Sequence, residues 1–278
     1  MSRIGVVTGT TQGLGLALAE GLARQLGSGD VVYLTGRDGD RVQAATERAP
    51  GPRAELRGQI LDVRDSIAVG AFADEIRARH GGVDIVFSNA AARLTPGTPP
   101  AELVGPFVDT NNLGATRMLR AFAPILRAGG RLLVVASDFG SLLRLSPRLH
   151  KRFDTDAMTL DDIDAVMLAW RDSVVWGLAA EEGWPEWINI PSKVGQVAAV
   201  RILARERRAA DSRHGALVAA VCPGLIDTAA SRPWFDDISG AQTPERAALA
   251  PLRLALAPGV DPGLYGELIQ FGKTIPWR

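Results

Sequence analysis

The chain has 278 residues, 46% of them hydrophobic and 22% charged, and its 31 basic and 31 acidic side chains give a formal net charge of zero. This is an ordinary globular composition, and the neutral balance gives no electrostatic reason to expect a nucleic-acid or anionic-membrane partner. The single cysteine, Cys222, excludes an intrachain disulfide and is typical of a reducing compartment. With no signal-peptide pattern and no apolar run of ~18 residues, we expect a cytoplasmic protein without a transmembrane helix.

Apolar segments of strand length alternate with helical patterns through the first half of the chain. The predicted strands cover residues 4–8, 31–35, 55–61, 83–88 and 131–136, and the predicted helices start near residue 13, start near residue 38, and cover residues 66–79 and 102–127. This alternation predicts a parallel sheet with helices on both faces and right-handed crossovers. Ligands of such sheets bind beyond the carboxyl ends of the strands.

The alternation stops after residue 141. Residues 142–188 contain no convincing strand, and Thr159 followed by Asp162 predicts a capped helix start inside this segment. We interpret its clustered carboxylates as helix-terminal charges and expect no metal site. Four of the six tryptophans also lie here, and they either pack the segment onto the body or line a pocket for a flat ligand. These are Trp170, Trp176, Trp184 and Trp187.

A helix near 191–208, a strand at 216–222, a helix at 244–256 and a strand at 265–271 complete the pattern. The sequence therefore predicts a doubly wound α/β fold, with a seven-stranded, mainly parallel sheet and helices on both faces. We expect one domain over residues 1–278, with residues 142–188 as a helical insertion or lid.

A glycine-rich stretch joins the first predicted strand to the first predicted helix. Gly9, Gly13 and Gly15 follow Thr8 in the spacing TGxxxGxG. Glycines at this spacing let the backbone approach a pyrophosphate, and the helix start offers free N–H groups. The candidate nucleotide-binding residues of the stretch are Gly9, Thr11, Gln12, Gly13, Leu14 and Gly15.

Several short motifs along the chain together resemble the short-chain dehydrogenase/reductase family. Besides the glycine stretch they are Asp62-Val63, Asn89-Ala90, Asn111, Ser137, Lys193, and Pro223-Gly224 with Thr228. They come in the family's order and cover nearly the whole chain, which implies a Rossmann fold that binds NAD(H) or NADP(H). The long insertion ending in Glu182-Gly183-Trp184-Pro185 is similar to the monomeric carbonyl-reductase subgroup, so we expect a monomer.

The resemblance also implies roles for individual residues. Asp62 and Val63 would border the adenine, and Asn89 and Ala90 would lie beside the cofactor ribose. Lys193 would bind the nicotinamide ribose. Thr228, in the segment that Pro223 and Gly224 open, would meet the carboxamide.

The end of the second predicted strand bears on the choice of cofactor. An NAD-preferring enzyme usually places a carboxylate there to accept from the ribose 2′-hydroxyl, whereas this chain has Gly36 followed by Arg37. A guanidinium can pair with a 2′-phosphate. We therefore predict NADP(H) as the cofactor.

One residue of the family's catalytic pattern is replaced. The pattern is Ser and Tyr-x-x-x-Lys supported by Asn; Ser137, Lys193 and Asn111 match it, but Asn189 stands at the tyrosine position. Asparagine has no proton to give near neutral pH, so it cannot be the general acid of a carbonyl reduction. The candidate catalytic residues are Ser137, Asn189, Lys193 and Asn111.

Three interpretations remain open. In the one we favour, an NADPH-dependent ketoreductase reduces a large aromatic polyketide of the angucyclinone type in antibiotic biosynthesis, and a phenol beside the reactive carbonyl supplies the proton. In the second, Asp138 is the acid, although a carboxyl with an ordinary pKa is an anion at neutral pH. In the third, the protein binds NADP(H) without turnover, as a sensor or regulatory protein. A dehydratase or isomerase on the same fold also stays open.

Overall fold

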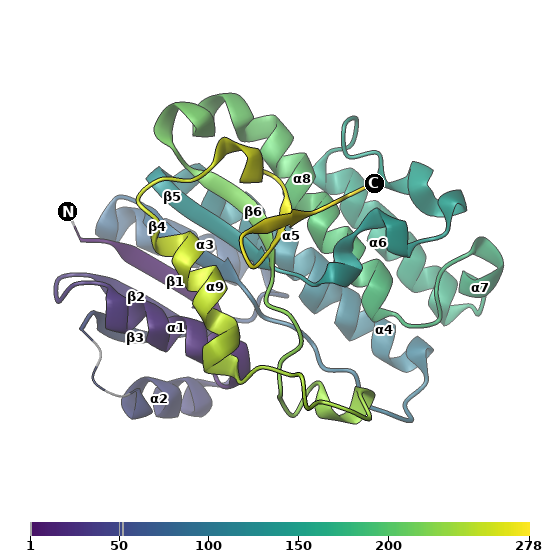
Figure 1. The fold of residues 1–278 in the computed structure, drawn as a ribbon, viewed down its shortest axis with the longest axis horizontal. Helices are drawn as coiled ribbons and strands as arrows, with labels where there is room; N and C mark the ends of the chain where they lie inside the picture. Colours follow the sequence, from purple (N-terminus) through teal and green to yellow (C-terminus); the bar gives the residue numbers. More distant parts are fainter. Residues whose placement is uncertain (1, 50, 52) are drawn as a thin grey trace.

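An eight-stranded sheet runs through the centre of the molecule in the order β3-β2-β1-β4-β5-β6-β7-β8 (Figure 1). The computed structural model describes residues 2–49, 51 and 53–278. The strands are β1 (Ile4–Thr8), β2 (Val31–Gly36), β3 (Glu55–Ile60), β4 (Val83–Ser88), β5 (Leu126–Val135), β6 (Leu217–Cys222), β7 (Leu268–Gln270) and β8 (Lys273–Ile275). Neighbours pair in parallel except β7 and β8, which are antiparallel.

The burial of each strand agrees with its place in the sheet, central or at an edge. Every residue of β1 and β6 is buried, as expected for apolar strands covered on both faces, whereas the edge strand β3 has no fully buried residue. The strand order reverses direction between β1 and β4. Side chains that follow these two strands therefore meet at the switch point where doubly wound sheets bind ligands.

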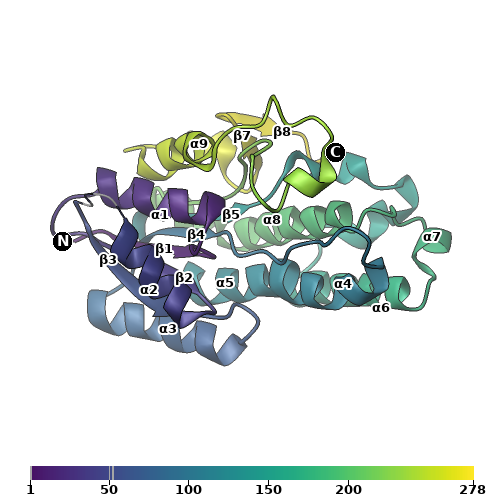
Figure 2. The same cartoon turned by 90° about the horizontal axis from the view of Figure 1, so that it is seen from below.

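Helices cover both faces of the sheet. Helices α1 and α9 pack together on one face, and α3, α5 and α8 follow one another on the other (Figure 2). The helices are α1 (Gly13–Gln25), α2 (Gly39–Arg48), α3 (Ser66–His80), α4 (Pro100–Val108), α5 (Gly114–Phe122), α6 (Leu160–Val175), α7 (Ala179–Glu182), α8 (Asn189–His214) and α9 (Pro244–Leu256). Shorter helical turns join them, including a π-helical turn at Asp109–Leu113 between α4 and α5.

The doubly wound α/β prediction is confirmed, with differences at the ends of elements. The sheet has eight strands rather than seven, because Phe271 and Gly272 adopt positive φ and turn the chain back into β8. The helix predicted over 102–127 ends early, since Pro124 lies in a short 3₁₀ turn and the chain is already extended at Leu126. The helix predicted from Pro191 begins at Asn189.

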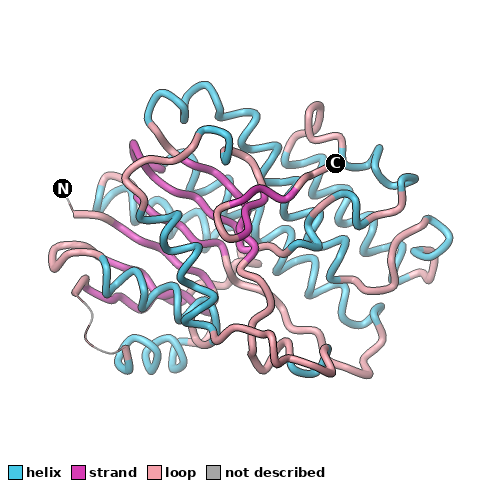
Figure 3. The backbone as a smooth tube through the Cα atoms, viewed as in Figure 1, coloured by secondary structure: helices cyan, strands magenta, loops and turns pink. Residues whose placement is uncertain are grey.

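Residues 142–188 form only helical turns, two α-helices and loops (Figure 3). The predicted capping box is confirmed: Thr159 Oγ1 accepts from the Asp162 backbone N–H at 3.2 Å, and the Asp162 carboxylate accepts from the Thr159 N–H at 2.8 Å. Trp170 and Trp184 are buried, which confirms their packing role, whereas Trp176 is 70% exposed.

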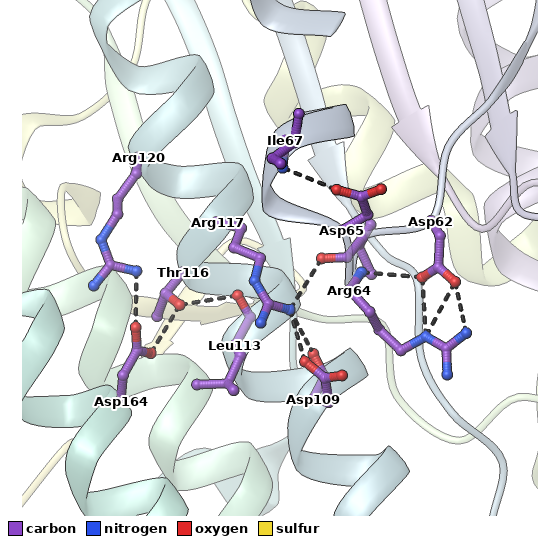
Figure 4. Close-up of polar contacts among 11 residues, drawn as sticks. Asp62, Arg64, Asp65, Ile67, Asp109, Leu113, Thr116, Arg117, Arg120 and Asp164 are labelled. Carbon is purple, nitrogen blue, oxygen red and sulfur yellow. Dashed lines mark hydrogen bonds and ion pairs between the residues drawn. The ribbon is translucent and has the colours of Figure 1, made fainter. Parts of the chain in front are cut away.

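Helix α6 lies against α4 and α8, and a polar contact fixes it to α5. Asp164 accepts hydrogen bonds from Thr116 Oγ1 and from an Arg120 guanidinium N–H, both at 2.8 Å (Figure 4). Burial raises the pKa of Asp164, although both partners favour its charged form. Among the described residues, no helix is long and apolar enough to cross a membrane.

Candidate active site

The predicted glycine turn packs tightly against the loop that follows β4. Gly9 has φ +70°, and a Cβ on Gly15 would lie 2.2 Å from the Gly9 carbonyl oxygen, so neither position accepts a side chain. Asn89 Nδ2 donates to the carbonyls of Thr8 and Gly9 at 2.9 and 3.3 Å. The structure thus brings the glycine turn and Asn89 together, and it assigns Asn89 at least a role in holding the turn.

The N-terminus of α1 opens beyond this turn. Its N-cap residue Gln12 has an extended backbone, and the Gln12 side chain makes no capping hydrogen bond to the amides of the first turn. The Gln12 side chain instead accepts from Arg41 at 3.3 Å. Arg41 and Arg37 are both exposed near the end of β2. Amides at a helix start with guanidinium groups beside them suit an anion.

Arg41 was missed in the sequence analysis. It lies in the first turn of α2, whose start is capped by Asp38 accepting from the Arg41 backbone N–H at 3.1 Å. That turn carries Arg41 toward Gln12. The spacing Arg37-x-x-x-Arg41 across a helix start was the available signal.

Asp62 follows β3, and its carboxylate is held by a near neighbour. Arg64 contacts it through the backbone N–H and through guanidinium N–H groups, at distances of 2.6 to 3.1 Å (Figure 4). These bonds lower the pKa of Asp62, and the charge of Arg37 lowers it further. Val63 is buried against Gly114, where an added Cβ would lie 2.8 Å from Val63 Cγ2. The pair therefore borders the predicted nucleotide site with one polar and one apolar side chain.

Ser137 follows β5 and caps the next 3₁₀ turn, with its hydroxyl engaged in hydrogen bonds. Ser137 Oγ donates to Asp138 Oδ1 at 3.0 Å and accepts from the Phe139 N–H at 3.3 Å. The other Asp138 oxygen accepts from Arg144 at 2.8 Å. Each Asp138 oxygen therefore has a hydrogen-bond donor beside it, the Ser137 hydroxyl at one and the Arg144 guanidinium at the other.

Lys193 and Asn111 are joined through a residue that the sequence analysis missed. Lys193 Nζ donates to Gln196 Oε1 at 2.8 Å and to the Val135 carbonyl at 3.3 Å, and Gln196 Nε2 donates to the Asn111 carbonyl at 2.9 Å. The Asn111 side chain accepts from the Ala92 N–H at 2.8 Å. Burial lowers the pKa of Lys193 to about 8. The i, i+3 spacing of Lys193 and Gln196 on one helix was the available signal.

Asn189 is the first residue of α8, one helical turn before Lys193. Its partly buried side chain forms no hydrogen bond within the part of the chain that the structure describes. The tyrosine position thus carries an amide with free donors and a free acceptor. Such a group can hold a substrate but cannot protonate it.

Three aromatic side chains, two of them close in sequence to Ser137 and Asn189, contact one another. Trp187 meets Phe139 edge-to-face with ring centroids 4.9 Å apart, and Phe235 meets Trp187 at 6.5 Å. Phe139 lies two residues after Ser137, and Trp187 lies two residues before Asn189. The buried Trp187 Nε1 has no hydrogen-bond partner among the described residues.

Phe235 belongs to the segment 224–243, which bridges the site. Gln242 fixes the start of this segment by donating from Nε2 to the Pro223 carbonyl at 3.0 Å. A Cβ on Gly13 would lie 3.7 Å from Thr228 Cγ2, so the segment reaches the glycine turn. At Gly224 the chain adopts φ +83°. The same segment therefore contacts both the predicted cofactor end and the aromatic end of the site.

Sheet order, glycine turn and polar strand ends together define a doubly wound, dinucleotide-binding type of α/β protein. The family described as short chain dehydrogenase matches residues 3–145. The chain belongs to the short-chain dehydrogenase family.

Relatives and solved structures resemble the chain over nearly its full length. Carbonyl reductase [NADPH] 1 of Sus scrofa is 30% identical over 99% of this chain and 94% of that protein. The Homo sapiens protein of the same name is 30% identical over 99% and 98%. The structure of salutaridine reductase from Papaver somniferum superposes with a TM-score of 0.77 at 25% identity, covering 96% of this chain and 99% of that one.

Proposed function

We propose that this protein is an NADPH-dependent carbonyl reductase, an oxidoreductase acting on C=O and CH–OH groups. The family membership and the similarity to carbonyl reductases support this class of reaction. When bound, NADPH supplies the hydride that reduces the carbonyl carbon.

The residues present fit this cofactor. The uncapped start of α1 and the glycine turn, which has no room for side chains, suit a pyrophosphate. Arg37 and Arg41 suit a 2′-phosphate, and position 36, where an NAD-preferring enzyme usually has a carboxylate, is a glycine. The residues proposed to hold the cofactor are Gly9, Thr11, Gln12, Gly13, Leu14, Gly15, Arg37, Arg41, Asp62, Val63, Asn89, Ala90, Lys193, Pro223, Gly224 and Thr228.

We propose further that the proton comes from the substrate. Asn189 has no acidic proton, and Ser137 directs its own proton at the Asp138 carboxylate. A phenol beside the reactive carbonyl would supply what these side chains do not. As the carbonyl carbon gains the hydride, its π pair moves to oxygen, which takes the phenol proton while the O–H pair stays on a delocalised phenolate.

The proposed substrate is therefore a hydroxylated aromatic ketone such as an angucyclinone-like polyketide, and the proposed setting is antibiotic biosynthesis. Phe139 and Trp187, which are two residues from Ser137 and Asn189 respectively, form an aromatic cluster with Phe235 that suits a flat polycycle. The observation that carries the proposal is the arrangement around Ser137. There the Ser137 hydroxyl donates to Asp138, and the tyrosine position carries an amide, which has no acidic proton.

The test compares two ketones that differ only at the phenol. NADPH oxidation is followed with the hydroxylated ketone and with its O-methyl ether, and binding of each is measured separately. We expect the ether to bind and to turn over at least about 100-fold more slowly. Equal turnover of the two would overturn substrate-derived proton transfer, and absence of turnover with any ketone despite NADPH binding would favour a non-catalytic sensor.

We also propose that the protein is a monomer. The insertion helix α6 lies on α8 and is fixed to α5 through Asp164, so it occupies a helix face that a second copy would need. A mass of about twice 29.5 kDa by light scattering would contradict this.

A further inference from the structure

A buried glutamine contacts Lys193, the lysine of the candidate site. Gln196 is 3% exposed and sits one turn after Lys193 on α8. Its carbonyl oxygen accepts from Lys193 Nζ at 2.8 Å, and its amide nitrogen donates to the Asn111 carbonyl at 2.9 Å. Ammonium only donates and a carbonyl only accepts, so these two partners fix the orientation of the amide.

Gln196 belongs to a largely buried part of α8. On the same helix Val194, Val197 and Ile202 are fully buried. An amide buried in such a place costs free energy unless both of its ends are bonded. Both ends are bonded here, and among the described residues their partners are Lys193 and Asn111 alone, so the polar contacts of Gln196 serve these two residues.

The bridge leaves Lys193 held on one side and free on the other. Two of the three ammonium protons are directed at Gln196 Oε1 and at the Val135 carbonyl. Within the part of the chain that the structure describes, the third has no acceptor and is left for a ligand in the site. The titratable group that faces Lys193 from β6 is Cys222, and burial raises the pKa of its thiol. A neutral acceptor stabilises the desolvated ammonium and leaves its positive charge in place. A carboxylate at the same position would neutralise that charge.

We propose that Gln196 is a positioning residue that keeps Lys193 protonated and aims its remaining N–H at the cofactor. This rests on the proposed function for the identity of the cofactor. Because an amide neither gives nor takes a proton near neutral pH, the bridge also offers Lys193 no partner for proton transfer. Gln196 therefore sets how tightly NADPH is held and up to which pH.

The test measures NADPH affinity by fluorescence titration, which needs no turnover, over a pH range that brackets about 8, the pKa of Lys193. In Gln196→Met the ammonium loses its nearest acceptor, so we expect affinity to fall at a pH about one unit lower than in the unchanged protein. In Gln196→Glu a carboxylate faces the ammonium, and we expect the fall about one unit higher.

Ser192→Ala is the matched control. Ser192 Oγ donates to Asn112 Oδ1 at 2.9 Å, and Asn112 Nδ2 donates to the Ser192 carbonyl at 2.8 Å, in an equally buried pair beside Lys193. We expect this variant to melt at a lower temperature with an unchanged pH midpoint. If both Gln196 variants keep the midpoint and lose only thermal stability, the glutamine is a packing residue and the inference is wrong.

A failure of the proposed function gives a different result. If the pH midpoint of NADPH affinity shifts in the Gln196 variants but no ketone is turned over, the role of Gln196 is upheld and the reductase is refuted. If a ketone is turned over but the pH midpoints do not shift, the reductase is upheld and the role of Gln196 is refuted. In an active protein, the Gln196 variants should raise the KM for NADPH more than they lower kcat at saturating NADPH.

Discussion

Ser137 donates its hydroxyl hydrogen to the carboxylate of the next residue, Asp138, across 3.0 Å. The same carboxylate accepts from Arg144 at 2.8 Å, so Ser137 and Arg144 both donate to Asp138. In a reductase site this arrangement supplies acceptors where a proton is needed. The activity of an Asp138 variant therefore distinguishes a proton that comes from the protein from one that comes from the substrate.

Replacing Asp138 with asparagine removes the carboxyl that accepts from Ser137. We expect kcat with a phenolic ketone to stay within a few-fold of the unchanged protein, because Asp138 acts as an acceptor and not as an acid. Steady-state kinetics with saturating NADPH measure this. A fall of about 10²-fold or more, the usual effect of losing a general acid, would instead identify Asp138 as the proton donor.

Arg41 should distinguish the two nicotinamide cofactors. Arg41→Ala removes a guanidinium that reaches Gln12 at the start of α1. Charge-assisted contacts are worth 1.5–3 kcal/mol, so we expect NADPH affinity to drop by about 10- to 100-fold. NADH affinity should not change, since NADH lacks the 2′-phosphate.

Arg48→Ala is the control for Arg41. Arg48 lies in the last turn of the same helix and donates to the Ala44 carbonyl at 3.0 Å. Fluorescence titration of both variants with both cofactors makes the comparison. An equal loss of NADH and NADPH affinity in Arg41→Ala would show that the residue shapes the loop and does not read the phosphate.

The residues that the sequence predicted well are those whose signal is local. The strand–glycine–helix unit, the buried strands and the Thr159–Asp162 capping box all follow from periodicity and short-range chemistry. Arg41 and Gln196 were missed because one partner of each, Gln12 and Asn111 respectively, is distant in sequence. Gln196 reaches the Asn111 carbonyl across 85 positions, and only the packing of α8 on the π-helical turn 109–113 brings them together.

The same reasoning explains the errors in the second half of the sheet. Strand β8 has three residues, too few for a periodic pattern, and its existence depends on the backbone of Phe271 and Gly272. The bond from Ser137 to Asp138 depends on the 3₁₀ turn that follows β5. The presence of Ser137 could be predicted from the sequence, whereas the direction of its proton could not.

Lys193 should make cofactor binding depend on pH. Burial lowers its pKa to about 8, so the ammonium loses its proton as the pH rises through that value. We expect NADPH affinity to be constant below this pH and to decline above it. In Lys193→Arg the guanidinium stays charged, so the affinity, although lower, should no longer decline there. A decline that persists in Lys193→Arg would assign it to another group.

The anchor of the insertion should be visible as stability. Asp164→Ala removes the acceptor of both Thr116 and Arg120, and we expect the free energy of unfolding to fall by about 1–3 kcal/mol. Asp161→Ala is the control, since Asp161 contacts Arg120 with a side chain that is 92% exposed, and its loss should cost well under about 1 kcal/mol. Denaturant unfolding of the two variants measures the difference, and equal losses would mean that Asp164 anchors nothing.

The aromatic cluster should act on the ketone and not on the cofactor. Phe235→Ala removes the contact between the segment 224–243 and Trp187, so we expect the KM for an aromatic ketone to rise several-fold while NADPH affinity stays unchanged. Trp234→Ala, at the neighbouring position and without a ring contact to Trp187 among the described residues, is the control.

Trp187→Phe keeps a ring against Phe139 but removes the unpartnered Nε1 donor. If that variant weakens ketone binding as much as Phe235→Ala does, the indole N–H bonds the substrate; if only Phe235→Ala acts, the cluster contributes apolar surface alone. Equal effects of Phe235→Ala and Trp234→Ala would remove Phe235 from the substrate site.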